Sequence, residues 1–302
     1  MKYLIILFIY IYSFAENITP IPLHVDDINI EKAKLGKKLF FDPILSKDGT
    51  VACVGCHFLD DGGDDNQKVS YGINGKNGTR NSPTILNSRY NFVQFWDGRA
   101  KDLEDQAKGP IENPVEMGNN FPNLIKTLNS SKYKNEFENI YKDGISKKNI
   151  VNAIAEYEKT LITPNSPFDR YLRGDKNAIT SEQKKGYKLF KKEGCIACHN
   201  GVNIGGNLYS KSGFFKPIQS DDLGRYEITH DIEDKHFFKV PTLRNIEKTA
   251  PYLHDGRFDK LKDVVESMMS YQLGKKRNSA DIKSIVEFLK SLNGELVNFE
   301  KN

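Results

Sequence analysis

The sequence has few of the residues that most often carry redox or metal chemistry. Its 302 residues include four cysteines, four methionines, six histidines and one tryptophan. Four cysteines are too few for a disulfide-dense scaffold. The 44 Lys and Arg residues nearly balance the 40 Asp and Glu residues, and a net charge of +4 argues against a dedicated nucleic-acid binder. With 38% hydrophobic residues the chain can form a packed core, and its length suggests about two domains.

Long hydrophobic runs are lacking after the first fifteen residues. Lys2 supplies a positive start, residues 3–14 are apolar, and Ser13-Phe14-Ala15 has the small-x-small pattern of a cleavage site. This pattern indicates a secretory signal peptide at 1–15, because the run is short for a membrane span. An uncleaved N-terminal anchor is the alternative. We expect the mature protein to lie outside the cytoplasm, in the periplasm.

All four cysteines belong to two copies of one motif, Cys53-Val54-Gly55-Cys56-His57 and Cys195-Ile196-Ala197-Cys198-His199. The pattern C-x-x-C-H is the attachment sequence of c-type haem. Each thiol binds one haem vinyl group, and the adjacent histidine reaches the iron as proximal ligand. Two disulfides or a Cys/His zinc site are the alternatives, but neither explains a repeated motif that uses every cysteine. We predict two covalently bound haems, with His57 and His199 on the irons.

The two haem motifs lie in a duplicated frame. Gly36 and Phe40 precede the first motif as Gly186 and Phe190 precede the second. Downstream, the segments 83–84 and 97–99 recur 158 residues later (241 minus 83) as 241–242 and 255–257. Only two long units occur, which indicates a tandem duplication rather than a solenoid. The breaker-rich stretch 163–167 marks the join, so we expect an N-terminal domain at 16–165 and a C-terminal domain at 166–302.

Apolar residues recur with helical spacing around 150–161, 261–268 and 282–289. Strand-like alternation is weak. Long loops rich in Gly, Asn and Asp at 60–81 and 200–222 fit segments that wrap a cofactor. We predict a mainly α protein with two tandem cytochrome c-type domains, each holding one haem.

Function depends on the face of each iron opposite its proximal histidine. Met268 lies on a helical apolar stripe and is the candidate sixth ligand of the second haem, although a core methionine explains the same position. Met269 is expected to point elsewhere. In the first half, Pro110 occupies the matching position, and no histidine lies between His57 and His199. We expect the first haem to lack a strong sixth ligand and to bind a small molecule.

Three more residues near the first haem are candidates. Glu116 and Gln106 lie in this region, and a carboxylate beside an open haem can move protons between peroxide oxygens. From the residues alone, both are more simply surface polar groups. Trp96, the single tryptophan, is either a core aromatic or a conductor between the haems.

Longer motifs narrow these alternatives. They are F-F-D-P-I-L-S at 40–46, R-N-S-P-T at 80–84, Q-F-W-D-G-R-A at 94–100, E-D-Q-A-K-G-P at 104–110, V-E-M at 115–117, T-L-I-T-P at 160–164, L-R-N-I at 243–246 and T-A-P-Y at 249–252. With these segments the chain resembles the bacterial di-haem cytochrome c peroxidases over nearly all of its mature length. The family reduces hydrogen peroxide to water with electrons from a small reduced cytochrome c or similar donor.

The resemblance implies roles for particular residues. The N-terminal haem would be the peroxidatic one, with Glu116 as acid–base residue and Gln106 as its distal partner. The C-terminal haem, held by His199 and Met268, would accept electrons, and Trp96 would lie between the haems.

The resemblance also implies a calcium ion, bound by the Asn81 side chain and by the carbonyl oxygens of Thr249 and Pro251. Such oxygen ligands suit Ca²⁺. It implies a homodimer as well, and no nucleic-acid partner or stable membrane insertion is expected.

One position departs from the family pattern. Many members carry a histidine in the loop that corresponds to 70–80, where it blocks the peroxidatic iron until the other haem is reduced. Here that position is Ile73, which cannot ligate iron, so we expect an unblocked haem.

Two alternative functions remain. A di-haem enzyme that oxidises protein tyrosine or tryptophan would use a tyrosine on the second haem, and an electron carrier would have two six-coordinate irons, with a lysine or Met117 completing the first.

Overall fold

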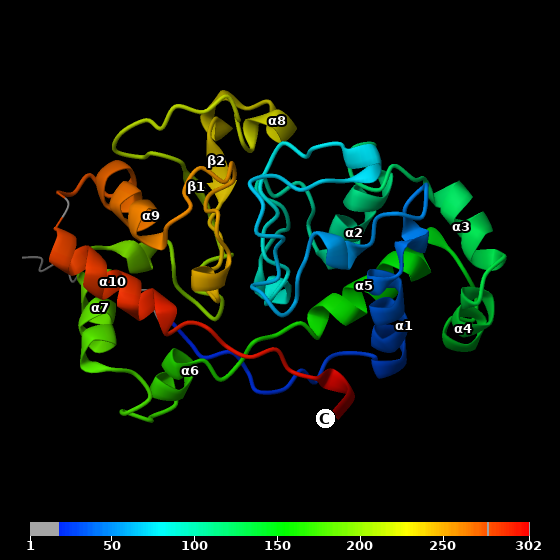
Figure 1. Cartoon of the computed structure of the whole chain (residues 1–302), viewed down its shortest axis with the longest axis horizontal. Helices are drawn as coiled ribbons and strands as arrows, with labels where there is room; N and C mark the ends of the chain where they lie inside the picture. Colours follow the sequence, from blue (N-terminus) through cyan, green and yellow to red (C-terminus); the bar gives the residue numbers. More distant parts are fainter. Residues whose placement is uncertain (1–17, 277, 302) are drawn as a thin grey trace, which may run out of the picture.

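The computed structural model describes residues 18–276 and 278–301, so the predicted signal peptide lies outside the described residues. Helices dominate, and they form two groups that lie side by side (Figure 1). The first group contains α1 (Ile30–Phe41), α2 (Leu103–Glu112), α3 (Phe121–Asn129), α4 (Tyr133–Ile140) and α5 (Lys147–Lys159). The second contains α6 (Pro167–Leu172), α7 (Ser181–Lys192), α8 (Tyr226–Thr229), α9 (Leu261–Ser267) and α10 (Ser279–Lys290). The prediction of a mainly α protein is confirmed.

Strand structure in the described part of the chain is limited to one small antiparallel pair. β1 (Tyr209–Lys211) pairs with β2 (Phe237–Lys239), with Ser210 opposite Phe238. Much of the remaining chain forms turns and long loops, including 60–81 and 200–222. Short 3-10 turns occur in the 60–81 loop and at both haem motifs.

A glycine in each half lets two long helices cross closely. A Cβ atom added to Gly36 on α1 would lie 1.8 Å from the carbonyl oxygen of Ala153 on α5. A Cβ atom added to Gly186 on α7 would lie 1.9 Å from the carbonyl oxygen of Ser284 on α10. Only glycine fits so close an approach of two backbones. The duplication seen in the sequence therefore appears in the structure as two equivalent helix pairs, α1 with α5 and α7 with α10.

Each helix group encloses its own hydrophobic cluster. One cluster is built from residues between 35 and 154, and the other mainly from residues between 168 and 292. The N-terminal segment crosses to the second group, where Ile18 joins the cluster and Arg244 donates a hydrogen bond to the Thr19 carbonyl. The C-terminal segment crosses the other way, and Phe299 packs against Tyr157 of α5. Figure 1 shows both ends crossing beneath the two groups.

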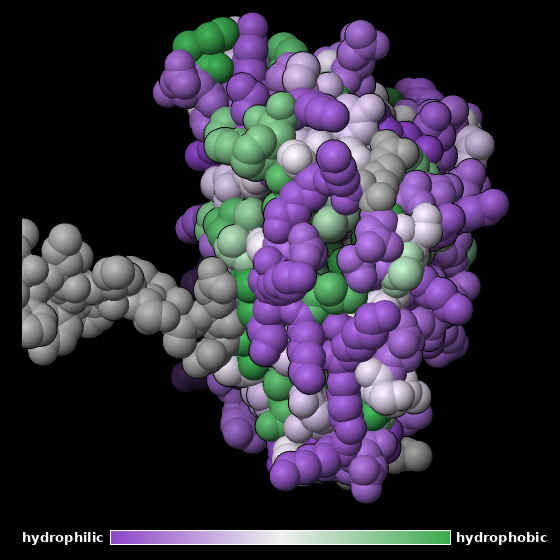
Figure 2. All heavy atoms as spheres, turned by 90° about the vertical axis from the view of Figure 1, so that its left-hand side faces the viewer, coloured by the Kyte–Doolittle hydropathy of each residue, from purple (hydrophilic) through white to green (hydrophobic). Residues whose placement is uncertain are grey.

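Hydrophilic side chains cover most of the face formed by the second helix group, with smaller apolar areas between them (Figure 2). None of the helices within 18–276 and 278–301 has the length and apolar character needed to cross a membrane.

Candidate functional site

Each C-x-x-C-H motif lies in the wall of a large cavity. Cys53 and Cys56 line the first cavity, and Cys195 and Cys198 line the second. The cavities enclose about 1520 and 1590 Å³, open solvent at their mouths included. All four thiols are free, so each pair is available for covalent attachment of a group that fills the cavity.

The two motif histidines have the surroundings of metal ligands. His57 Nδ1 lies 3.0 Å from the Gly63 carbonyl oxygen, and His199 Nδ1 lies 3.3 Å from that of Ile204. When Nδ1 donates to a carbonyl, Nε2 is left as the ligand nitrogen. Burial lowers the pKa of both imidazoles, that of His199 to about 4. Both side chains are therefore neutral imidazoles that can bind iron.

The cavity walls also fit the chemistry of haem, a large apolar ring that carries propionates. Both are lined largely by apolar side chains, and the first also contains buried polar atoms that lack a protein partner. Ser88 Oγ and Glu158 Oε2 are buried without a hydrogen-bond partner, and both residues line the first cavity. Lys239 lines both cavities and is buried, and no ion pair among the described residues includes it. Such a buried cation suits a cofactor that brings carboxylates.

Two of the predicted catalytic residues lie in the wall of the first cavity. Gln106 projects from α2, and Glu116 follows in the turn after that helix; both line the cavity with His57. Asn113 Nδ2 donates a hydrogen bond of 2.5 Å to Glu116 Oε1. Burial raises the pKa of Glu116, while the Asn113 hydrogen bond and the charge of Arg99 act in the opposite direction. Glu116 is thus a buried carboxyl whose position is fixed by a hydrogen bond, rather than a solvated surface group.

The 70–80 loop packs against the segment that carries Glu116. The Ile73 amide donates to the Glu116 carbonyl at 2.7 Å, and a Cβ atom on Gly72 would lie 2.1 Å from the Val115 carbonyl oxygen. Ile73 is buried and is not among the residues that line the cavity, whereas Tyr71 and Gly72 are. Within the described chain, His57 is the one histidine in the lining of the first cavity.

Met117 also lines the first cavity and belongs to the hydrophobic cluster of the first helix group. Met117 is therefore positioned in the right cavity for the alternative in which its thioether is the sixth ligand of the first iron. Spectroscopy of the oxidised protein distinguishes a methionine-ligated iron from one that lacks a sixth ligand.

The two cavities share a wall. Trp96 lines both, and its Nε1 donates a hydrogen bond of 2.9 Å to the Asn81 carbonyl. The His254 ring lies 6.3 Å from the Trp96 ring and is stacked on Phe238. Lys239 belongs to the same wall, and sequence reasoning missed it. The one available signal was the duplicated frame, in which Lys239 corresponds to Asn81 (239 minus 158).

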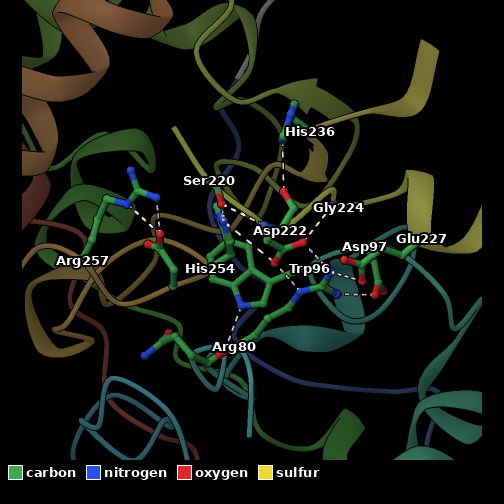
Figure 3. A network of polar contacts seen from close by, with 12 residues as sticks. Arg80, Trp96, Asp97, Ser220, Asp222, Gly224, Glu227, His236, His254 and Arg257 are labelled. Carbon is green, nitrogen blue, oxygen red and sulfur yellow. Dashed lines mark hydrogen bonds and ion pairs between the residues drawn. The ribbon is translucent and has the colours of Figure 1, made fainter. Parts of the chain in front are cut away.

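An ion-pair network joins the two helix groups beside this wall (Figure 3). Arg80, at the end of the 70–80 loop, pairs with Asp97 on its own half. It also reaches Asp222 at 2.6 Å and Glu227 at 3.0 Å from the second half. His254 Nε2 lies 3.9 Å from Asp222 Oδ2. Arg80 lines the first cavity, so the network holds that cavity against the second half.

Met268 and Met269 both line the second cavity. The expectation that Met269 points elsewhere is wrong. The α-helix ends at Ser267, and Met268–Gln272 continues as a π-helix. Wider π winding turns successive residues through a smaller angle than α winding, so neighbouring side chains diverge less. A π turn in a cavity wall is a frequent feature of functional sites.

The three residues proposed for calcium all line the second cavity, and Asn81 lines both. Asn81 Nδ2 donates to the Gln67 carbonyl at 2.8 Å, which leaves Oδ1 as the end available to a cation. Asp64 is a buried carboxylate whose two oxygens have no partner. A Cβ atom on Gly62 would lie within 2.9 Å of both Asp64 Oδ1 and the Lys248 carbonyl oxygen, so this carboxylate lies close to the residue that precedes Thr249.

Two cavities with haem-attachment motifs, sharing one tryptophan-containing wall, define a di-haem c-type protein. The sequence profile of the di-haem cytochrome c peroxidase family matches residues 30–177. Cytochrome c551 peroxidase of Nitrosomonas europaea is 46% identical over 276 residues, which are 90% of this chain and 83% of that protein. Cytochrome c551 peroxidase of Pseudomonas aeruginosa is 46% identical over 291 residues, covering 91% and 84%.

The crystal structure of a MauG-like protein associated with microbial copper homeostasis superposes with a TM-score of 0.82 at 25% identity, and covers 94% of this chain and 95% of that one. The chain belongs to the di-haem cytochrome c peroxidase family, and the resemblance noted in the sequence is confirmed.

Proposed function

We propose that this chain is a cytochrome c peroxidase that converts hydrogen peroxide, two protons and two electrons into two water molecules. The electrons come from a small reduced cytochrome c or a similar donor. The observation that carries the proposal is the presence of Glu116 and Gln106 in one cavity with His57. The relatives named as peroxidases are more similar to this chain than the MauG-like structure is, which favours peroxide reduction over oxidation of protein tyrosine or tryptophan.

Each cavity would hold one haem c, attached through its two cysteine thiols, with His57 or His199 as iron ligand. Haem iron in the first cavity would supply the site where peroxide binds and where the electrons reach it. A division of the chain into domains 16–165 and 166–302 gives one haem to each.

Glu116 moves the proton that peroxide cleavage requires. Its carboxylate accepts a proton from the peroxide oxygen nearer the iron and returns it to the oxygen that leaves as water. The Asn113 hydrogen bond holds Oε1, so the other carboxylate oxygen is left for the substrate. The Gln106 amide can donate and accept hydrogen bonds in the same cavity. Polar groups held in place before the reaction need little reorganisation when charge shifts between the oxygens.

Met268 is our proposed sixth ligand of the second iron, and Trp96 is the proposed route for electrons between the cavities. Because Met269 lines the same cavity, an experiment must show which of the two methionines is the ligand. Met268→Ala should abolish the thioether–iron absorbance of the oxidised protein, and Met269→Ala should keep it. The reverse result would assign the ligand to Met269.

We also propose that Ca²⁺ binds through the Asn81 side chain and the carbonyl oxygens of Thr249 and Pro251. Metal analysis of the purified holoprotein and of Asn81→Ala tests this. Further proposals are cleavage after residue 15, a periplasmic location and a homodimer, which mass spectrometry of the exported protein, cell fractionation and light scattering test.

The decisive experiment is peroxide turnover by the fully oxidised holoprotein, with a reduced small cytochrome c and no reductive pretreatment. Immediate turnover supports both the peroxidase and the unblocked first haem. Turnover only after reduction keeps the peroxidase but shows that another group blocks the iron. No turnover in either state would overturn the proposal in favour of an electron carrier or an enzyme that oxidises protein side chains.

A further inference from the structure

Glu158 is a buried carboxyl that the mechanism above does not use. It lies near the end of α5, is 4% exposed and lines the first cavity. Its Oε2 is buried with no hydrogen-bond partner. A buried carboxylate without a cation or donor is costly, so it is found mainly where it has a function or shifts its protonation state.

The duplicated fold supplies an internal comparison for this residue. A Cβ atom on Gly36 would lie 2.9 Å from Tyr157 Cβ, and one on Gly186 would lie 2.8 Å from Phe288 Cβ. Tyr157 and Phe288 are therefore equivalent in the two helix pairs.

Aromatic contacts confirm the register. The Tyr157 ring lies 5.3 Å from that of Phe40, and the Phe288 ring lies 5.2 Å from that of Phe190. The next residue in each half is Glu158 or Leu289, and each lines the cavity of its own half. The first cavity thus has a carboxyl where the second has a leucine.

Charges on the elements that pack against α5 are engaged elsewhere. Lys37 of α1 pairs with Glu300 of the C-terminal segment. Arg89, in the 3-10 turn Ser88–Tyr90, pairs with Asp27 and donates to the Lys159 carbonyl, and Glu104 of α2 accepts a hydrogen bond from Asn152.

Titratable and charged side chains that share the cavity with Glu158 are Cys53, Cys56, His57, Tyr71, Arg80, Arg99, Glu116 and Lys239. Burial raises the pKa of the Cys53 thiol and of the neighbouring Tyr157 phenol, and the charge of Glu158 acts on both in the same direction. Burial alone raises the pKa of Glu158 to about 8. The group can therefore change protonation near neutral pH.

We propose that Glu158 is the redox-linked proton site of the first haem. When the iron in that cavity gains one electron from the donor, the Glu158 carboxylate takes up one proton from solvent; when the iron loses the electron, Glu158 releases the proton. The reason is electrostatic: the electron removes one positive charge from a low-dielectric cavity, so the carboxylate loses stabilisation. Leu289 cannot exchange a proton, so the second cavity lacks this coupling.

The coupling has a consequence for peroxide reduction, which consumes protons. Each electron that reaches the first cavity brings a proton to Glu158 within it. This inference rests on the proposed function only in requiring a haem in the first cavity.

The test is the reduction potential of each haem in the holoprotein, measured by spectroelectrochemistry across neutral pH. We expect the potential of the first haem to fall as pH rises, approaching about 59 mV for each tenfold change in proton concentration. Glu158→Gln should abolish this slope, and Glu116→Gln, the matched change of the other cavity carboxyl, should keep it. A flat wild-type potential, or a slope that survives in Glu158→Gln, would overturn the proposal.

Two further measurements keep the proposal testable if Glu158→Gln does not assemble. The infrared difference spectrum of the wild type on reduction of the first haem should contain the carbonyl band of a newly protonated carboxyl, and its absence overturns the proposal. Leu289→Glu should give the second haem a pH-dependent potential. Haem content, measured separately, distinguishes the two failures: loss of the first haem from wild type contradicts the proposed function, whereas a full complement of haem without the slope contradicts only the role of Glu158.

Discussion

Replacing Glu116 by glutamine removes the proposed proton carrier and leaves the shape of the side chain unchanged. A positioned general acid–base group contributes about 10²–10⁴-fold to a rate, so peroxide turnover should fall by that factor while haem content stays normal. Glu112→Gln is the matched control, because Glu112 is half-exposed, pairs with Lys147 and does not line the cavity.

Asn113→Ala tests the same reasoning through pH. The lost hydrogen bond stabilises ionised Glu116, and a hydrogen bond to a charged group is worth about 1.5–3 kcal/mol. Its removal should raise the pKa of Glu116 further. Activity that needs the carboxylate is lost as pH falls through this pKa, so the acid limb of kcat/KM should move to higher pH in Asn113→Ala.

Steady-state kinetics across pH, with haem content and helical circular dichroism as folding controls, decide the outcome. Turnover of Glu116→Gln within a factor of ten of wild type would remove Glu116 from the mechanism. An acid limb that stays in place in Asn113→Ala would show that some other group controls it.

Three further predictions concern the frame of the site. Arg244→Met should lower the free energy of unfolding by about 3–5 kcal/mol, because Asp169, paired with Arg244 at 2.6 Å, stays buried without a cation; denaturant titration measures this, and a loss below ~1 kcal/mol would contradict it. Gly186→Ala should lower the free energy of unfolding by about 1–3 kcal/mol, because the added Cβ clashes with the α10 backbone. Gly78→Ala is the control: its Cβ would meet no atom closer than 3.7 Å, so its stability should stay near that of wild type. With Ile73 outside the cavity lining, electron paramagnetic resonance of the oxidised protein should lack a low-spin bis-histidine signal.

Several features of the site could be predicted because their chemistry is local. The thiols and imidazole of each haem motif lie within five consecutive residues, 53–57 and 195–199, so their spacing alone indicates the cofactor. The helices around 150–161, 261–268 and 282–289 follow from apolar periodicity, and the structure has α5, α9 and α10 there. Glu116 and Gln106 were assigned through longer motifs, and the tertiary structure brings both into the cavity of His57.

Other features depend on contacts between residues far apart in the chain. Met269 joins Met268 in the wall of the second cavity, where the helix changes winding at Met268, and no apolar spacing reveals that change. Lys239 becomes part of the shared wall only when β2 packs beside Trp96. Nor does the sequence show that each end of the chain crosses to the opposite helix group.

The amino-acid sequence by itself therefore determined the cofactor type, the duplication and the helical class, because these depend on covalent chemistry and on periodicity over a few turns. The tertiary structure decided which side chains face each cavity and which groups stay buried without partners. Glu158 and Leu289 illustrate the difference: both lie at the same place in a repeated helix pair, yet only packing shows that each one faces a haem cavity. Burial then gives the carboxyl a property that the leucine cannot have.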